Sequence, residues 1–427
     1  MRIRIRKKPL LLMVSFIFLF LCWHHFFLIV SLPDKIDKLL EYDFLVPLIS
    51  VIGGIYGIFV VLLNRKFVNK YKELFSYLMV LTIFIFVLFL YSTLKYNKQL
   101  TIVTGKGVLP FLTALFTIPL LLYLDRGGKM EHLFEVINLF SIMWDILIIA
   151  QVVYYKKYGV FWGDFWTYFK RFYNQGTYGL RISLNVFGNI MILYNLVYLR
   201  YTRKILRKLW HLFATILGIY CLIFIQQTRA VYLYIVICIF VWVYFYSEKT
   251  IRARIIQFSG LGVVVYALFF SNVVSKFISS FSLTGENAFS TSARIYAIKY
   301  YIDCILNNPI FGNGIADGAA NSFYSYIEHG LKGIAYYSDN GLIGLMANIG
   351  ILGAVIIYVI PVIFMYKSWK QNHYYLDKKN EVFLFLIIVY CIVTVPTFLM
   401  VGEANRYALL LPIFISLFES IKKKNMS

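Results

Sequence analysis

Charged residues are scarce in this sequence. Of its 427 residues only 15% are charged, whereas 60% are hydrophobic and 19% are aromatic. In average soluble domains about a quarter of all residues are charged, so this composition excludes an ordinary soluble protein. Cysteine is rare as well: the five cysteines include no C-x-x-C pair, and only Cys304 lies outside an apolar run. The sequence therefore predicts neither a disulfide framework nor a zinc site, and we expect no cofactor.

Long apolar runs are what the sequence has in abundance. About 20 apolar residues carry a helix across a bilayer. About twelve such runs are present, near residues 10–32, 44–63, 74–94, 108–124, 133–154, 182–199, 211–228, 230–247, 255–271, 341–366, 382–400 and 407–419. Because backbone polar groups must be paired inside a bilayer, helices are the expected element. We predict an all-α polytopic membrane protein of about twelve transmembrane helices, forming a single integral-membrane domain over residues 1–427.

Basic residues outnumber acidic ones by 42 to 20, which gives a formal net charge of +22. When the runs are threaded from a cytoplasmic N-terminus, every cytoplasmic loop is basic, as the positive-inside rule requires. The excess is therefore a topology signal and not a nucleic-acid surface. Both termini are predicted to be cytoplasmic. The run at 10–32 resembles a signal peptide without a small-residue cleavage site, so we expect a retained signal-anchor helix.

One long external loop, residues 272–340, lacks a membrane-length apolar run and is expected to cap the active-site mouth. Hydroxyl residues at 290–292 predict a helix start, and the Asn-Asn-Pro sequence ending at Pro309 predicts its stop. Between them, apolar residues recur on one helix face at Ile295, Ile298, Ile302, Ile305 and Leu306. The pattern predicts a short amphipathic helix with Arg294 in its first turn. A turn at 311–314 follows, whose glycines permit close backbone approach.

Two sets of cations lie at the predicted external surface. Arg229 stands between two apolar runs with almost no loop around it. Its guanidinium can reach lipid headgroups, or it can fork onto a phosphate or pyrophosphate. The loop 156–181, which ends at Arg181, mixes cations with aromatic residues. That composition is typical of an interfacial helix, and it also suits a surface where an anionic substrate docks.

Candidate acids and bases are few. Glu41 and Asp43 are closely spaced external carboxylates, and they form either a solvated turn or a divalent-metal site. Glu403 and Arg406 share the last external loop, either as a local ion pair or as substrate contacts. Asp145 is a carboxylate at membrane depth, which either bonds to a neighbouring helix or faces a wet cavity.

Three elements of the second half resemble, in order, those of the O-antigen ligase and Wzy-type polysaccharide polymerase superfamily. The first, Arg229-Ala-Val-Tyr-Leu233, is similar to an Arg-x-x-x-Leu element. The second is Arg294 with its helix and the following Asn308-Pro-Ile-Phe-Gly312-Asn-Gly314. The third, Asp339-Asn340 with Gly350-Ile-Leu-Gly353 nine residues later, is similar to a His-Asn-x9-Gly-x-x-Gly element. The resemblance covers roughly residues 211–366, and Asp339 stands where ligases carry histidine.

The resemblance implies a multi-pass glycosyltransferase of the bacterial cytoplasmic membrane with its active site on the external face. It implies a metal-independent polysaccharide polymerase that moves a glycan from a polyprenyl-pyrophosphate donor to a lipid-linked repeat-unit acceptor. Its partners would be membrane lipids, a flippase and a chain-length regulator, with no nucleic acid. Catalytic roles fall on Arg229, Arg294 and Asp339. Candidate substrate-binding residues are Arg181, Lys299, His329, Asn340, Glu403 and Arg406, of which His329 and Glu403 are also reserve candidates for the general base.

Three other functions stay open at this point. A ligase that moves finished glycan to another acceptor would carry the same motifs. A metal-dependent transferase would use Glu41 and Asp43 as its carboxylates. A lipid-linked oligosaccharide flippase or transporter also commonly has twelve spans. Transporters tend to show repeated halves, however, and in this sequence only the second half carries a long external loop.

Overall fold

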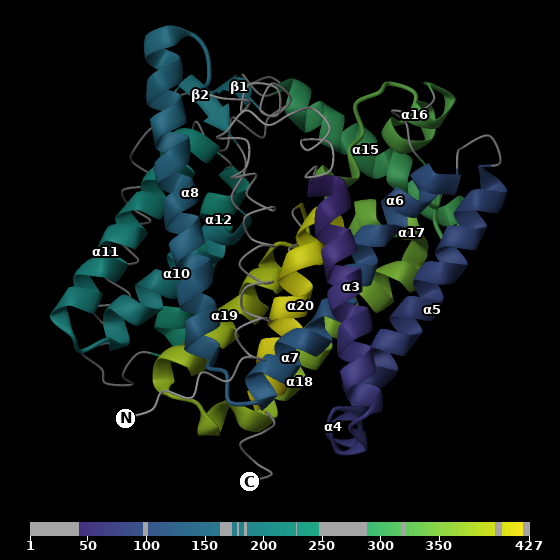
Figure 1. The fold of residues 1–427 in the computed structure, drawn as a ribbon. Coiled ribbons are helices and arrows are strands. Elements are labelled where there is room, and N and C mark those ends of the chain that lie inside the picture. Colours follow the sequence, from purple (N-terminus) through teal and green to yellow (C-terminus); the bar gives the residue numbers. More distant parts are fainter. Residues whose placement is uncertain are drawn as a thin grey trace.

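The computed structural model describes residues 42–96, 101–162, 173–176, 179–182, 186–227, 229–246, 288–316, 322–397 and 404–421. Within these ranges the elements are helices apart from one short hairpin (Figure 1). The predicted runs at 10–32 and 255–271 lie outside the described residues. The other predicted runs all coincide with helices, so a polytopic helical membrane protein is confirmed, while the number of spans stays a prediction.

The helices of the first half are α3 (Tyr42–Leu62), α4 (Arg65–Lys70), α5 (Lys72–Lys95), α6 (Thr101–Leu112), α7 (Thr117–Asp125) and α8 (Met130–Tyr158). The 3₁₀ turn η2 (Thr113–Phe116) joins α6 to α7. A hairpin follows, formed by β1 (Tyr173–Gly176) and β2 (Gly179–Ile182), and then come α10 (Val186–Tyr201), α11 (Ile205–Tyr220), the π-helical turn η3 (Cys221–Gln226) and α12 (Arg229–Tyr246).

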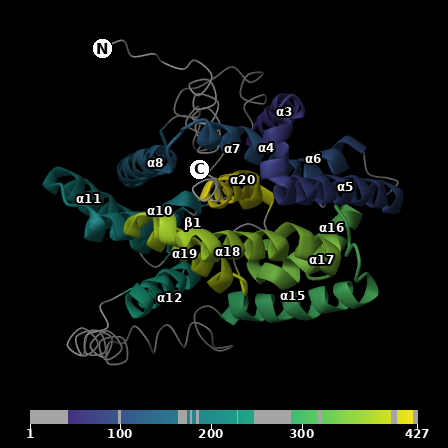
Figure 2. The same cartoon turned by 90° about the horizontal axis from the view of Figure 1, so that it is seen from below.

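The second half begins with α15 (Ala288–Asn307), α16 (Ser322–His329) and the 3₁₀ turn η4 (Tyr337–Asn340). It continues with α17 (Gly341–Ala354), the π-helical turn η5 (Val355–Val359), α18 (Ile360–Asn372), the 3₁₀ turn η6 (His373–Tyr375), α19 (Lys378–Val393) and α20 (Ala404–Ile421). Seen from below, α20 lies in the middle of the bundle (Figure 2). Its side chains at Leu410, Leu411 and Ile415 are fully buried, as expected of a helix that is apolar all round.

Among the described residues, five helical stretches are long and apolar enough to cross a membrane. They are Lys72–Lys95, Gly107–Asp125, Met130–Tyr158, Ile205–Gln226 and Gly341–Tyr375. Shorter apolar helices occupy Leu48–Leu62, Ala230–Tyr246 and Leu410–Ile421. Many large apolar side chains on these helices are exposed, for example Phe59 and Phe86 at 67% and 61%. Such exposure is expected for side chains that face the lipid tails of a membrane.

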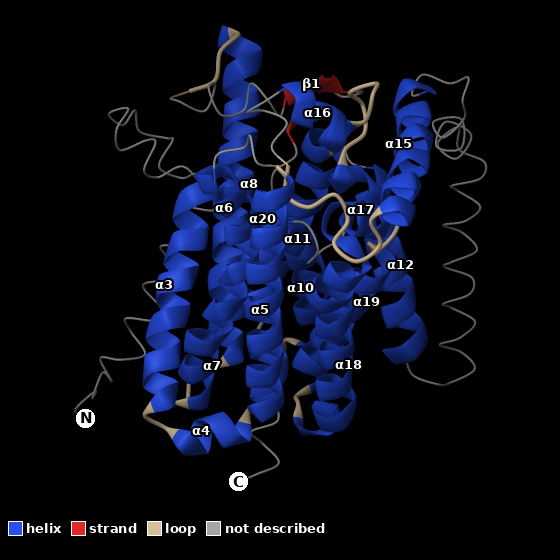
Figure 3. Cartoon of the chain, turned by 90° about the vertical axis from the view of Figure 1, so that its right-hand side faces the viewer, coloured by secondary structure: helices blue, strands red, loops and turns tan. Residues whose placement is uncertain are grey.

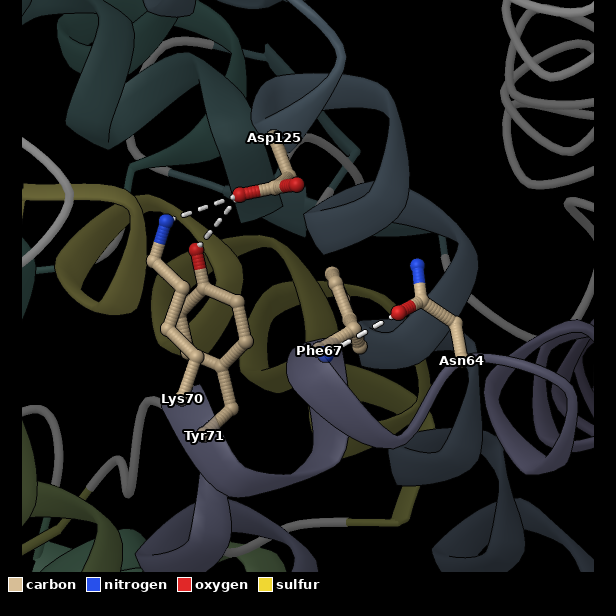
Figure 4. Close-up of polar contacts among 5 residues, drawn as sticks. All are labelled: Asn64, Phe67, Lys70, Tyr71 and Asp125. Carbon is tan, nitrogen blue, oxygen red and sulfur yellow. Dashed lines mark hydrogen bonds and ion pairs between the residues drawn. The ribbon is translucent and has the colours of Figure 1, made fainter.

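The two ends of the bundle differ in character. The hairpin, α15 and α16 gather at the end drawn uppermost in Figures 1 and 3, which we call the loop end. The helix α4 lies at the opposite end, which we call the basic end. There Asn64 caps α4 by accepting from the amide of Phe67 at 3.3 Å. The Lys70 ammonium and the Tyr71 hydroxyl both donate to Asp125, at 3.0 and 3.1 Å (Figure 4). These bonds tie the junction between α4 and α5 to the end of α7.

A short hairpin accompanies the helices, which otherwise make up the predicted all-α architecture. Its strands are antiparallel, with Tyr173 opposite Ile182 and Asn174 opposite Arg181. Gly176 pairs with Gly179, so only two residues connect the strands. The end of the loop 156–181 is therefore extended, whereas residues 163–172, which carry most of the aromatic side chains that favour an interfacial helix, lie outside the described residues.

Candidate functional site

A glycine-containing turn after α15 packs backbone to backbone against a break in α17. The break is at Gly350, whose φ of 78° and ψ of 171° are not helical. The amide of Gly314 donates to the carbonyl of Asn348 at 2.8 Å, and that of Ile351 donates to the carbonyl of Pro309 at 2.8 Å. The Gly-x-Gly turn and the Gly-x-x-Gly segment, which are far apart in the sequence, thus form one unit.

The close approach explains why glycine occupies these positions. Gly312 and Gly350 both have positive φ, 60° and 78°, a conformation that side chains disfavour. A Cβ on Gly350 would meet the carbonyl oxygen of Ile310 far inside van der Waals contact, and one on Gly312 would meet the carbonyl oxygen of Ala347. The expectation from the sequence, that these glycines let backbone come close, is confirmed.

The same turn is held on its other side by α5. The Tyr91 hydroxyl donates to the Gly312 carbonyl at 3.2 Å, and the Ser92 hydroxyl accepts from the Ile315 amide at 2.9 Å. The Tyr91 ring stacks on Phe311 with centroids 5.1 Å apart. The turn is therefore fixed between two helices, which gives the loop end a rigid floor.

The predicted helix in the external loop is confirmed as α15, and it ends at Asn307 as its Asn-Asn-Pro sequence indicates. The face that packs on the bundle is not the isoleucine face, however. Ala297, Tyr301 and Cys304 are buried, together with Ala347 of α17. Small residues at such a contact let helix backbones approach closely. Most of the isoleucine face, by contrast, stays exposed: Ile302 retains 42% of its surface, whereas Ile305 packs against the buried cluster.

Tyrosines join α15 to the segment before α17. The rings of Tyr301 and Tyr337 stack with centroids 4.8 Å apart. The carbonyl of Ile327 accepts from the hydroxyls of Tyr300 at 2.9 Å and Tyr337 at 3.5 Å. It also accepts from the side-chain amide nitrogen, Nδ2, of Asn313 at 3.4 Å. We call Tyr300, Tyr301 and Tyr337 the tyrosine cap. The three tyrosines are close in sequence to Arg294 or Asp339, and this proximity is the signal that could have predicted the cap.

Arg294 lies where the packed side of α15 meets its exposed apolar side, three residues before the buried Ala297 and four before the exposed Ile298. Its Nε is buried and has no hydrogen-bond partner among the described residues. A buried guanidinium nitrogen without an acceptor is costly, and such a group marks a place for an anionic ligand. Along α15, Arg294 is about 10 Å from Tyr301, whose stacking partner Tyr337 precedes Asp339 by two residues.

Asp339 and Asn340 close η4 at the start of α17. The Asp339 side chain is half-buried, whereas Asn340 is only 3% exposed. The Asn340 amide nitrogen donates to the Tyr336 carbonyl at 2.9 Å, and its buried Oδ1 has no hydrogen-bond partner among the described residues. The start of α17 is fixed to the end of α19, because the Leu342 amide donates to the Val395 carbonyl at 3.0 Å.

His329 and Lys299 flank this region. His329 Nδ1 lies 2.8 Å from the Ala335 carbonyl, and its ring lies against Tyr336 with centroids 4.8 Å apart. Because a carbonyl can only accept, the neutral ring carries its proton on Nδ1 and its basic nitrogen is Nε2. Lys299 is exposed on α15.

Arg229 is the first residue of α12, directly after a strained stretch. The preceding turn η3 is π-helical, and Gln227 is the one non-glycine residue with positive φ, 49°, in the described part of the chain. Residues held in such conformations cluster at functional sites. The strand β2, which carries Arg181, packs against η3. The backbones that carry these two arginines therefore meet at the loop end.

Several predicted site residues stay untested. The structure describes the backbone alone of Arg181, Arg229 and Arg406, while Glu403 and Glu41 lie outside the described residues. Asp145 lines a cavity of about 30 Å³ together with residues that include Asn189 and Gln226. Such a volume is large enough for one water molecule, so the wet-cavity interpretation of Asp145 fits the geometry.

Comparison with known proteins bears on the part of the chain that carries this site. Residues 212–358 match the model of the family described as O-Antigen ligase (Wzy_C). The matched segment runs from α11 to η5, and it contains Arg229, Arg294, Asp339 and the packed glycines. No curated protein sequence matches the chain. The resemblance drawn from the three sequence elements is thereby confirmed, and residues 212–358 form an O-antigen ligase domain of the Wzy_C family, whose membrane enzymes transfer lipid-linked glycans in ligase or polymerase fashion.

Proposed function

We propose that the protein is a polysaccharide polymerase at the outer face of the bacterial cytoplasmic membrane. It transfers a growing glycan from a polyprenyl-pyrophosphate donor to a lipid-linked repeat-unit acceptor. The observation that carries the proposal is Arg294, in the segment that matches the O-antigen ligase family. Its buried Nε has no hydrogen-bond partner among the described residues, and its helix is joined through the tyrosine cap to the segment that carries Asp339.

The reaction assigns a role to each catalytic residue. An acceptor hydroxyl attacks the anomeric carbon of the donor glycan, and the bond from that carbon to the pyrophosphate oxygen breaks. Arg294 and Arg229 stabilise the charge that develops on the leaving diphosphate, which is where fixed cations lower a barrier most effectively. Asp339 accepts the proton of the attacking hydroxyl as general base. His329 and Glu403 are the reserve candidates for that base.

The remaining predicted residues contact substrate in this proposal. Lys299 and Arg181 add positive charge for the diphosphates, and Arg406, which the structure places in the first turn of α20 and not in a loop, is a further candidate contact. Asn340 offers amide hydrogen-bonding groups for sugar hydroxyls. The external loop 272–340 caps the mouth of the site, and a flippase and a chain-length regulator are the protein partners that such a polymerase needs.

Deletion of the gene, followed by electrophoresis of extracted surface glycan, tests the function. The polymerase proposal expects the ladder of glycan lengths to collapse to single repeat units. Accumulation of long lipid-linked chains would instead identify a ligase, and loss of all external repeat units would identify a flippase. An unchanged ladder would contradict all three.

Ligation is the second candidate, because the matched family is described by that activity. A ligase hands finished glycan to a different acceptor with the same donor chemistry. Asp339, at the position where ligases carry histidine, leads us to favour the polymerase. Purified protein supplied with one lipid-linked repeat unit as both donor and acceptor separates the two, since only a polymerase lengthens it.

We also propose that the reaction needs no metal ion. The alternative is a metal-dependent transferase that uses Glu41 and Asp43. Full activity of purified protein in a strong chelator would support the metal-free mechanism. Loss of activity that Mg²⁺ or Mn²⁺ restores, and that Asp43→Asn abolishes, would favour the alternative.

A further inference from the structure

An exposed apolar row runs along α15 outside the predicted membrane spans. Ile295, Ile298, Ile302 and Leu306 retain 42%, 37%, 42% and 73% of their surface. They lie on the side of the helix away from Ala297, Tyr301 and Cys304, which pack on the bundle. Exposed apolar side chains are ordinary on a span, but a contiguous row on a loop helix marks an interaction surface.

The row is continuous with the lipid-facing surface of a span. After α15 ends, Ile310 is 58% exposed, and its carbonyl lies directly against Gly350. The next residues of α17, Ile351 and Leu352, are 44% and 43% exposed. They belong to the membrane-length helical stretch Gly341–Tyr375. Exposed apolar side chains therefore stand on both sides of the junction between α17 and α15, where the exposed Asn307 lies beside them.

A cation stands at the far end of the row. Arg294, Ile298, Ile302 and Leu306 are spaced four residues apart, which places them along one edge of the helix. From Arg294 to Leu306 this edge is about 18 Å long. The Arg294 Nε is buried without a partner among the described residues. A guanidinium followed by a long apolar row matches an amphiphile with an anionic head and an extended tail.

The charges beside the row argue against simple contact with an anionic lipid surface. A helix that lies on such a surface carries lysines and arginines along its polar face. Here Lys299 and Asp303, which are both exposed, have opposite charge. Arg294, at the N-terminal end of the row, is instead the cation whose buried Nε has no hydrogen-bond partner among the described residues.

We propose that Ile295, Ile298, Ile302, Leu306 and Ile310 form a lipid track that holds the first isoprene units of the polyprenyl tail of the substrate, with its diphosphate at Arg294. The proposal rests on the proposed function, because it names where that substrate lies. It also explains why the isoleucines of α15 face outward. The tail enters from the bilayer beside Ile351 and reaches Arg294 along α15.

Photocrosslinking tests the track directly. The probe is polyprenyl pyrophosphate without a glycan, with a diazirine on one of its first isoprene units, added to the full-length protein in lipid nanodiscs. We expect crosslinked peptides from residues 295–310, and their loss on competition with unlabelled polyprenyl pyrophosphate. Crosslinks confined to other spans would overturn the track, as would labelling of α15 that competitor does not reduce, which is the behaviour of bulk lipid contact.

Kinetics with matched variants give a second test. Ile298→Ser with Ile302→Ser should raise KM for a long-tailed donor about tenfold, leave kcat within about twofold and leave KM unchanged for a donor that carries a methyl group in place of the isoprenoid tail. The control is Ile216→Ser, at an exposed position on α11 that retains 60% of its surface, and it should change neither. Ile302→Val should keep the wild-type KM. Equal KM changes for both donors, or none, would overturn the track.

The two tests separate this inference from the proposed function. A protein that crosslinks on α15 but transfers no glycan would retain the track and lose the polymerase. A protein that transfers glycan with no crosslink on α15 would retain the polymerase and lose the track.

Discussion

Arg294 is the residue on which the proposed chemistry depends most. Its replacement by Ala should lower kcat/KM by about 100-fold or more, as removal of one charge-stabilising donor does in other enzymes. Arg294→Lys should recover only part of this, because an ammonium lacks the planar fork that suits a diphosphate. The measurement is chain lengthening by purified protein. Lys332→Ala, which removes another exposed cation of the loop end, is the control and should stay near wild type.

Asp339 makes a separate prediction, because its role is proton transfer. Asp339→Asn keeps the shape and removes the basicity, so kcat should fall by about 10²- to 10⁴-fold while KM for the donor changes little. Asp339→Glu should retain measurable activity. Wild-type kcat in Asp339→Asn would disqualify this carboxylate, and His329→Gln and Glu403→Gln would then be measured as the reserve candidates.

The buried phenol of Tyr337 is expected to make the stability of the folded protein depend on pH. Burial raises the pKa of its phenol well above the usual value of about 10, and the hydrogen bond with Asn313 opposes the shift. A raised folded-state pKa means that the stabilising contribution is complete below about pH 10 and is lost as the pH rises further. The melting temperature of purified protein should therefore fall as the pH rises above about 10, and Tyr337→Phe should flatten that fall. An unchanged slope in the variant would assign it to other groups.

At the scale of elements, the glycine turn and the break in α17 form one joint. Gly350→Ala should lower the free energy of unfolding by about 3 kcal/mol, because the new Cβ would collide with backbone and φ is positive. The control is Gly333→Ala, where φ is also positive at 65° but no atom lies within 4 Å, so about 1 kcal/mol is expected. Thermal unfolding in detergent measures both. Equal effects would mean that the close packing contributes nothing.

The helix α15 and the Gly312–Gly314 turn show which features of the structure can be predicted from the sequence. The end and the helical nature of α15 were predictable, because the apolar period and Asn-Asn-Pro act locally. Its start was not, since the helix begins at Ala288, which places the hydroxyl residues 290–292 inside the helix and Arg294 beyond its first turn. The direction of its faces was not, since hydropathy does not distinguish a side chain that faces lipid from one that faces protein. The partner of the Gly312–Gly314 turn could not be predicted either, because backbone packing against Gly350 is a long-range contact with no local pattern.

In the whole molecule, the candidate catalytic residues and the basic loops lie at opposite ends of the helix bundle. The loop end holds α15, η4 and the start of α12, which carry Arg294, Asp339 and Arg229, while basic loops line the opposite end. The positive-inside rule assigns such loops to the cytoplasm. It follows that the loop end is external in the proposed orientation, where flipped lipid-linked glycans are found, so the proposed function and the proposed topology stand together.

Two exposed positions at opposite ends test this orientation. Leu331, after α16, and Tyr374, between α18 and α19, are each 82% exposed, so a cysteine at either site should react equally well once accessible. The described native cysteines are all buried, which keeps background labelling low. A thiol reagent that does not cross membranes should label Leu331→Cys in intact cells, and Tyr374→Cys only after the membrane is opened. The reverse pattern would place Arg294 and Asp339 in the cytosol. The site could not then reach glycans at the outer face, and the polymerase would have to be abandoned even if both residues proved essential.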